Sequence, residues 1–470
     1  MTLWRASVLA AALSMSGCVG LPSKPRPAAL PTQAPLSDYA GEHGTWPAPD
    51  WWKRYHDATL DQLIDMALKS SPTLAAARAR FDSARQSVRI AGAVSGAHID
   101  AVADADRQRL SDNGVFPPRL LGFYWYDLYD LGLQASYTFD WWGKQKDLVD
   151  AALDEAHAAR AERSAAALML ATSVADAYFG WQADQSRLTL ARERETTLLR
   201  EAGITASRIH AELESADQMH RADSGVAAVR EQIAGLEGSA RLRVVAIAAL
   251  VGSSAADLPA FTAKPLPAID GALPDDVGID LLARRADITA SRWRVEAAEK
   301  NRDSARAEFY PDISINALLG VQSIDIGNLL NYGSRVPQVA AAVHLPIFDE
   351  GRLKARYGAA QVGIDSAVAS YRETLVDAAR DVATQAATRA QIAAQRAQRV
   401  IEVDAAQRLR ASAAARVRQG VDDSRTELTA TDSWIEQRDA LLQLDAQALS
   451  TDIGLQRALG GGYERTKATP

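Results

Sequence analysis

Cysteine is almost absent from this sequence of 470 residues. The single cysteine, Cys18, excludes any disulfide within the chain, so covalent cross-links do not hold the fold together. Aromatic residues are also scarce, at 6%, which is low for a compact enzyme and natural for helices that pack through alanine. No apolar run reaches about 18 residues, so the sequence predicts no ordinary transmembrane helix.

An excess of positive charge is also missing. The formal net charge is -7 and the isoelectric point is near 5.6, which argues against nucleic acid as the main partner. The hydrophobic content of 47% excludes a chain that is disordered throughout. The chain is therefore predicted to fold, with partners other than nucleic acid.

Catalytic motifs are absent as well. The sequence contains no His-Glu-x-x-His, no phosphate-binding Gly-x4-Gly-Lys and no Gly-x-Ser-x-Gly. The seven histidines are scattered; His210 and His220 flank an acidic turn but do not form a convincing metal site. An enzyme is therefore disfavoured, and no metal is predicted.

Long helices without proline dominate what is present. The stretch from Ala151 to Ser207 contains no proline and is rich in strong helix formers. Its apolar residues recur at alternating steps of four and three, the spacing of coiled coils, although such a seam alone is also typical of a purely structural coiled coil. Residues 352–418 and 424–458 follow the same rhythm, and 213–251 does so more weakly. The seam of the first stretch consists of Ala167, Ala171, Val174, Tyr178, Trp181, Gln185 and Leu188.

The first residues have the features of a bacterial secretion signal. Arg5 precedes a short apolar run, and Met15-Ser16-Gly17 then leads directly into Cys18. This arrangement resembles the lipoprotein cleavage box, which implies removal of residues 1–17 and attachment of a diacylglycerol and an N-acyl lipid to Cys18. A plain signal peptide with an incidental cysteine is the alternative. The residues that follow, 18–57, begin with a Pro- and Ala-rich segment and are predicted to form a tether.

Four later stretches alternate between apolar and polar residues, as β-strands with two different faces do. In each stretch the odd-numbered residues are apolar: 99–105, 131–141, 313–321 and 339–347. Loops at 107–130 and 323–337 separate the strands of each pair. Aromatic residues gather at the opposite end of the strands, namely Tyr137, Phe139, Trp141, Phe309, Tyr310 and Phe348.

The two halves of the chain repeat one order of elements: helix, strand, loop, strand and two long helices. Arg78 and Arg80 in the first half align with Arg292 and Arg294 in the second, at a constant offset of 214 residues (292 minus 78). The predicted organisation is a signal peptide (1–17), a lipid-anchored tether (18–57), a first repeat (58–257), a linker (258–274), a second repeat (275–459) and a tail (460–470).

Strands of about ten residues with one apolar face match the strands of transmembrane barrels, although soluble hairpins alternate in the same way. Four strands are too few to close a barrel, and their unpaired edges cannot lie in lipid. A barrel built from this chain must therefore be completed by other copies.

Two motifs carry a resemblance to a known family. Residues 281–288, Leu-Leu-Ala-Arg-Arg-Ala-Asp-Ile, continue to Tyr310-Pro311, and residues 345–352 read Leu-Pro-Ile-Phe-Asp-Glu-Gly-Arg. Together they resemble signatures of the outer-membrane factor family, the TolC-like channels, and within it the OprM/NodT-type efflux lipoproteins. Ala286 departs from the pattern, which usually has proline there. The resemblance covers about residues 51–459.

The resemblance implies a mixed α and β membrane protein. Three copies would form one twelve-stranded barrel in the outer membrane of a Gram-negative cell, continued into the periplasm by an α-helical barrel of coiled-coil hairpins. It implies a passive, gated exit duct for drugs or other small toxic molecules, without a cofactor. A periplasmic adaptor and an inner-membrane pump would be the partners. A type I protein-secretion conduit or a periplasmic adaptor lipoprotein is the alternative, and the sequence does not name the exported substrate.

The turn that follows the second long helix is the predicted gate. Gly420 allows the chain to leave one helix, and Asp422 and Asp423 suit the N-terminus of the next, so simple capping is the alternative role. The resemblance implies that the periplasmic entrance narrows here and that Asp422 matches an acidic position of OprM-like channels. A ring of such carboxylates would favour cations.

Other gate candidates lie close to this turn or in the corresponding turn of the first half. Arg418 and Arg425 are near enough in sequence to pair with the acidic residues and to hold neighbouring hairpins shut. Glu212 stands where the first-half turn of the family often has glycine, and Asp217 lies at the end of that predicted turn, which runs from about His210 to Asp217.

Overall fold

The computed structural model describes residues 29–31, 44–269, 272–274 and 277–464. The predicted signal peptide and Cys18 lie outside the described residues. The chain forms two compact units whose segments alternate along the sequence. We call them the strand unit, which contains Asp82–Ala158 and Arg292–Ser370, and the helical unit, which contains Pro31–Phe81, Ala159–Ser291 and Tyr371–Pro470.

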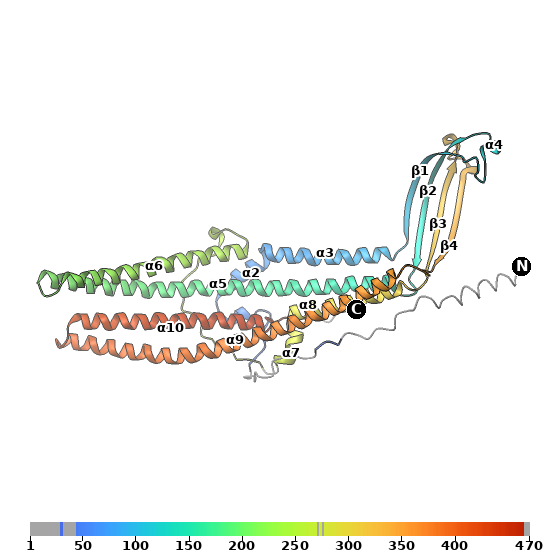
Figure 1. The fold of residues 1–470 in the computed structure, drawn as a ribbon. Coiled ribbons are helices and arrows are strands. Elements are labelled where there is room, and N and C mark those ends of the chain that lie inside the picture. Colours follow the sequence, from blue (N-terminus) through green and yellow to red (C-terminus); the bar gives the residue numbers. More distant parts are fainter. Residues whose placement is uncertain (1–28, 32–43, 270–271, 275–276, 465–470) are drawn as a thin grey trace. The chain divides into compact units, whose positions relative to one another are not determined.

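The strand unit contains one antiparallel sheet in which sequential strands are neighbours, in the order β1-β2-β3-β4 (Figure 1). The two edges of this sheet, formed by β1 and β4, pair with no other strand among the described residues. The strands are β1 (His98–Arg109), β2 (Trp125–Phe139), β3 (Asp312–Ser323) and β4 (Arg335–His344).

The register of the sheet places all odd-numbered strand residues on one face. Leu133 of β2 lies opposite Ala101 of β1 and Leu319 of β3, and the other pairs likewise join two odd or two even numbers. Because side chains alternate along a strand, the odd residues form one continuous surface, which we call the odd face. The prediction of a shared apolar face is thereby confirmed.

Several strand boundaries differ from the prediction, including the start of β4 at Arg335, inside the predicted loop 323–337. β1 and β2 continue into the expected loop 107–130, since their ladder extends to Arg109 opposite Trp125 and aromatic residues favour extended backbone. β4 ends at His344, earlier than predicted, because Pro346 has no N–H to donate to a ladder.

The aromatic group expected at the end of the sheet away from the loops lacks one member. Phe309 was predicted there, but it is only 4% exposed and packs edge-on against Tyr357, with ring centroids 6.4 Å apart. It directly follows a helix, so helical packing rather than strand alternation sets its direction. Tyr310 stacks on Trp142 instead, at 4.6 Å.

The long helices form two hairpins, α5 beside α6 and α9 beside α10 (Figure 1). The bounds predicted for α9 and α10 are confirmed, whereas α5 begins earlier than its predicted start at Ala151. The four helices are α5 (Lys144–His210), α6 (Ala216–Val251), α9 (Arg352–Arg418) and α10 (Ser424–Ala458).

The core of the helical unit is built on the predicted seam of α5. Val174 and Tyr178 are fully buried and pack in one cluster with Leu60, Ile247 and Ile453, which come from three other helices. Alternating steps of four and three therefore do mark the face on which the helices meet. The other helices are α2 (Ala58–Ser70), α3 (Pro72–Val94), α4 (Pro118–Leu121), α7 (Val277–Arg284) and α8 (Ala286–Ala307).

The last residues of the expected tether belong to this core. Trp51 is 3% exposed and Asp57 is 8% exposed. The Asp57 carboxylate accepts hydrogen bonds from the Tyr178 hydroxyl at 3.0 Å and from the Lys264 ammonium at 3.1 Å. Burial alone would raise the pKa of Asp57, but these bonds and two backbone amides outweigh it and leave the pKa below its usual value.

The linker between the repeats also packs on the helical unit, because it supplies Lys264 to that carboxylate and Phe261 to the rings of Trp181 and Tyr178. Among the residues that the structure describes, no helix is both long and apolar enough to cross a membrane.

Candidate functional site

The turns that close the two hairpins differ in backbone chemistry. Gly420, between α9 and α10, has a φ of 71°, the left-handed conformation that the sequence predicts. Glu212, between α5 and α6, has a φ of 58° although its side chain disfavours that conformation. The first turn therefore carries backbone strain at the position where the related pattern has glycine.

Four charged side chains from both turns meet in what we call the turn cluster: Arg208, Glu214, Asp423 and Arg425. The Glu214 carboxylate lies 3.0 Å from the Arg208 guanidinium and 2.7 Å from that of Arg425. Asp423 lies 3.6 Å from Arg208 and 3.8 Å from Arg425. Because Glu214 lies in the turn between α5 and α6 and Arg425 lies in the first turn of α10, the cluster joins the two hairpins of one chain.

Glu214 is the most enclosed member of the turn cluster. Its side chain is 11% exposed, and one of its carboxylate oxygens is buried without a hydrogen-bond partner among the described residues. The Arg208 contact is a charge-assisted hydrogen bond, which is stronger than a bond between neutral groups, and the Arg425 contact is an ion pair. Loss of Glu214 would leave both arginines without their nearest carboxylate.

The remaining gate candidates take other roles. Asp423 caps α10 by accepting a hydrogen bond from the Arg425 backbone N–H at 3.1 Å. Asp422 pairs instead with Arg416 of α9, at 2.7 Å. Arg418 donates to the Ala414 carbonyl of its own helix at 3.2 Å and, among the described residues, has no carboxylate within ion-pairing distance.

Asp217, the last of these candidates, lies in the first turn of α6, where a negative charge is favourable to the helix. The structure thus brings Asp423 and Arg425 together and leaves Asp217, Gly420 and Arg418 outside the cluster.

A ladder of ion pairs continues from the turn cluster along α5 and α10. The Arg187 guanidinium donates two hydrogen bonds to the Asp439 carboxylate, at 2.8 and 3.0 Å. The Arg194 guanidinium likewise donates two to the Asp432 carboxylate, at 2.8 and 3.2 Å. The rungs are seven residues apart on both helices, so the pairs repeat with the coiled-coil period. These half-buried, two-pronged bonds fix the register of one hairpin against the other.

The sequence-based prediction missed Arg208, Glu214 and Arg416. A signal for Arg208 was present: it follows Arg187 and Arg194 at multiples of seven residues (187, 194, 208), and Glu201 occupies the skipped position. Only the antiparallel partner helix, which the sequence does not identify, shows which carboxylates these arginines meet.

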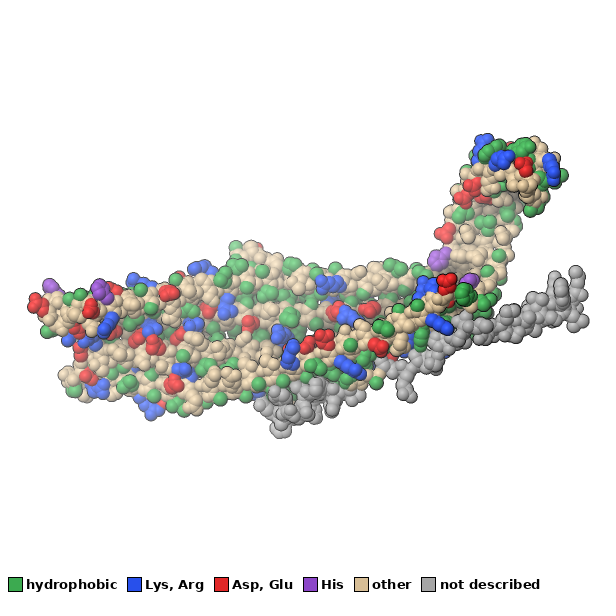
Figure 2. Space-filling model, viewed as in Figure 1, with side chains coloured by type: hydrophobic (Ala, Val, Ile, Leu, Met, Phe, Trp, Pro, Cys, Tyr) green, Lys and Arg blue, Asp and Glu red, His purple; other side chains and the backbone are tan. Residues whose placement is uncertain are grey.

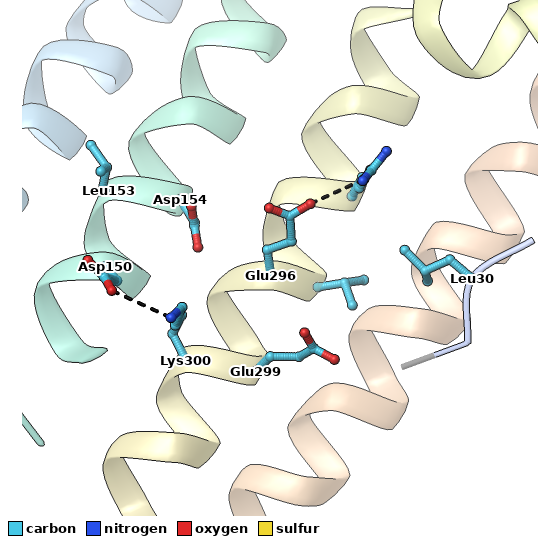
Figure 3. A pocket seen from close by; sticks show the side chains of 9 residues that line it. Leu30, Asp150, Leu153, Asp154, Glu296, Glu299 and Lys300 are labelled. Carbon is cyan, nitrogen blue, oxygen red and sulfur yellow. Dashed lines mark hydrogen bonds and ion pairs between the residues drawn. The ribbon is translucent and has the colours of Figure 1, made fainter. Parts of the chain in front are cut away.

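The strand unit contains a second group of charges, around a cavity of about 460 Å³ between α5 and α8 (Figure 3). Asp154 of α5 and Glu296 of α8 face each other there, and Lys300 lies 3.5 Å from Asp150. Burial, and then the nearby Glu296, raise the pKa of Asp154 to about 6. Lys300 partly offsets this rise, and Arg292 pairs with Glu296 at 3.1 Å, so the pocket holds charges of both signs.

No group of three or more potential metal ligands lies close enough together to hold an ion in the part of the chain that the structure describes. Both charged groups contain ion pairs between basic side chains and carboxylates.

The sequence matches the family model described as outer membrane efflux protein, over residues 63–253 and 279–461. It is 31% identical to the multidrug resistance outer membrane protein MdtP of Escherichia coli K12, across 97% of this chain and 96% of that protein. It is 32% identical to MdtQ of E. coli O157:H7, with 89% of each chain covered.

The fold is also similar to solved structures. The outer membrane protein VceC of Vibrio cholerae superposes with a TM-score of 0.79 at 32% sequence identity, covering 89% of this chain and all of that one. The Campylobacter jejuni outer membrane channel CmeC, at 21% identity, shares the fold with a TM-score of 0.83.

Proposed function

The chain belongs to the outer membrane efflux protein family, and on this basis we propose that three copies form a gated exit duct for drugs or other small toxic molecules. The protein is an outer-membrane channel component and not an enzyme. What we propose beyond family membership is the number of copies, the gate, the exported molecules and the lipid anchor.

The open sheet is the observation that carries the proposal. Its odd face carries an apolar band on each of the four strands, while Asp100 and Gln134 lie opposite one another on the even face. A sheet with two free edges cannot remain open in lipid, because each unpaired backbone group there would cost several kcal/mol. Bacterial barrels have at least about eight strands, so the smallest closed assemblies need two or three copies. The resemblance to TolC-like channels favours three.

The relatives' names support drugs as the cargo, since MdtP and MdtQ are called multidrug resistance proteins. An exit duct of this kind has no energy source of its own, so we propose that it works with a periplasmic adaptor and an inner-membrane pump. A type I protein-secretion conduit is the second candidate, because the same fold would serve it.

Restoration of drug resistance tests the function. We expect the chain, expressed with the adaptor and pump encoded nearest to it, to lower the susceptibility of a strain that lacks its own efflux ducts. Heat-resistant trimer bands should appear in the outer-membrane fraction. Export of a protein substrate without any change in drug susceptibility would favour the secretion conduit instead.

Cys18 is proposed to carry the lipid anchor. Several acyl chains together with a barrel would hold the N-terminus at the inner leaflet, where one chain alone binds only marginally. Labelled palmitate should enter the wild-type protein and not the Cys18→Ser variant, and the variant should still insert its barrel. Equal labelling of both proteins would refute lipidation at Cys18.

A further inference from the structure

Basic side chains collect at the end of the sheet where the loops are (Figure 2). Along β1 the odd face is apolar from Ile99 to Ala105 and then carries Arg107 and Arg109. On the opposite edge, Arg335 is the first residue of β4. We call Arg107, Arg109 and Arg335 the arginine rim.

Each arginine of the rim lies against an aromatic ring. The guanidinium carbon is 6.0 Å from the Trp125 ring for Arg107, 5.6 Å from Tyr124 for Arg109 and 4.2 Å from Tyr332 for Arg335. These rings are themselves exposed, by 54% for Trp125 and Tyr124 and by 80% for Tyr332. Exposed tryptophan and tyrosine at the border of an apolar band are typical of a membrane interface.

The guanidinium groups of the rim keep their hydrogen-bond donors free. Among the described residues, none of the three donates a hydrogen bond to a protein acceptor. Asp127 and Asp112 lie 3.8 Å from Arg107 and Arg109, too far for hydrogen bonds, and the two arginine side chains are 71% and 52% exposed. An aromatic ring on one side orients each guanidinium while its N–H edge remains open, which is the geometry that binds phosphate in two-pronged fashion.

We propose that the arginine rim binds the phosphate groups of anionic lipid headgroups in the outer leaflet. The proposal rests on the proposed function, because the odd face must meet lipid. The apolar band is about ten residues long on its strands, or ~25 Å tall when the strands tilt, so the rim lies where one headgroup layer begins. The loops mark the end of the sheet away from the helices, which places that layer on the outer side.

The rim lies on both edge strands, which matters for an assembled barrel. Arg107 and Arg109 are on β1, and Arg335 is on β4. Closure through copies joins β1 of one copy to β4 of the next, so arginines from two copies border the same seam. A headgroup with two phosphates could bridge that seam and hold the copies together.

Binding of a fluorescent, bisphosphorylated lipid A to the purified assembly in detergent tests the proposal. The wild type should bind it about tenfold or more tightly than lipid A without phosphates. Changing Arg107, Arg109 and Arg335 to glutamine should remove that preference. Changing them to lysine should keep part of it, since lysine retains the positive charge but cannot donate two parallel hydrogen bonds to one phosphate. Inorganic phosphate at millimolar concentration should not displace the lipid.

The matched control replaces three exposed arginines of the helices, Arg221, Arg241 and Arg372, with glutamine and should bind as the wild type does. Equal binding by the rim variant, equal binding of the phosphate-free lipid, or displacement by inorganic phosphate would each overturn the proposal. Single-channel conductance tests the channel function separately from lipid binding. A rim variant that conducts normally but binds no lipid supports the lipid site, whereas a wild type without conductance refutes the proposed duct.

Discussion

An arginine in the middle of the odd face should prevent stable insertion of the barrel. Leu133 and Val339 lie near the centre of the apolar band, on β2 and β4. Their side chains are 52% and 78% exposed in the single chain, so no protein core would shelter the new charge. Leu133→Arg or Val339→Arg should each cost ~2–4 kcal/mol, because a charge at mid-depth must leave water.

The depth of the residue provides the first control. Val343 is on the same face of the same strand as Val339 but beside its end at His344, close to the aromatic group. Val343→Arg should therefore cost only ~0–1 kcal/mol, as expected near an interface. The neighbouring even face provides the second control, since Gln134→Ala should leave assembly intact.

Heat-resistant trimer in outer-membrane fractions is the measurement. We expect a strong loss for Leu133→Arg and Val339→Arg, a slight loss for Val343→Arg and none for Gln134→Ala. Equal loss in all four variants would show that the odd face does not meet lipid.

The turn cluster should hold the resting duct closed. Glu214 accepts a hydrogen bond from Arg208 and forms an ion pair with Arg425. A hydrogen bond to a charged group contributes ~1.5–3 kcal/mol. Partial exposure of Arg425 lowers this figure through screening. Even about 1.4 kcal/mol shifts an open–closed equilibrium tenfold. Arg425→Ala and Glu214→Gln should therefore raise resting conductance in planar bilayers by about tenfold or more.

Arg418 is the matched control for Arg425. The sequence alone named Arg418 and Arg425 together as pairing residues, but the Arg418 guanidinium bonds to a carbonyl of its own helix. Arg418→Ala should leave resting conductance unchanged. If Arg418→Ala opens the channel as much as Arg425→Ala does, the cluster is only a structural link.

Local patterns predicted much of the fold. The sequence correctly predicted that the odd-numbered residues of each strand share one face, because side chains alternate within a single strand. The register of the sheet then places these four faces on the same side. The bounds of α9 and α10 followed from Gly420 and the capping residues beside it, which act within one turn of helix.

Contacts between elements distant in sequence required the tertiary structure. Glu214 and Arg425 are separated by most of the second repeat, so nothing local selects Arg425 over Arg418. The choice depends on how α5 and α10 are rotated about their axes, which the ladder at Arg187 and Arg194 shows directly.

By itself, then, the sequence determined the type of each element, the polarity of each face and the family, because these depend on spacing along one stretch of chain. The tertiary structure alone decided which arginines meet Glu214, that Phe309 is buried and that arginines occupy both edges of the sheet. Those facts depend on the packing of separate elements against one another, where the burial of side chains from several elements at once selects the partners.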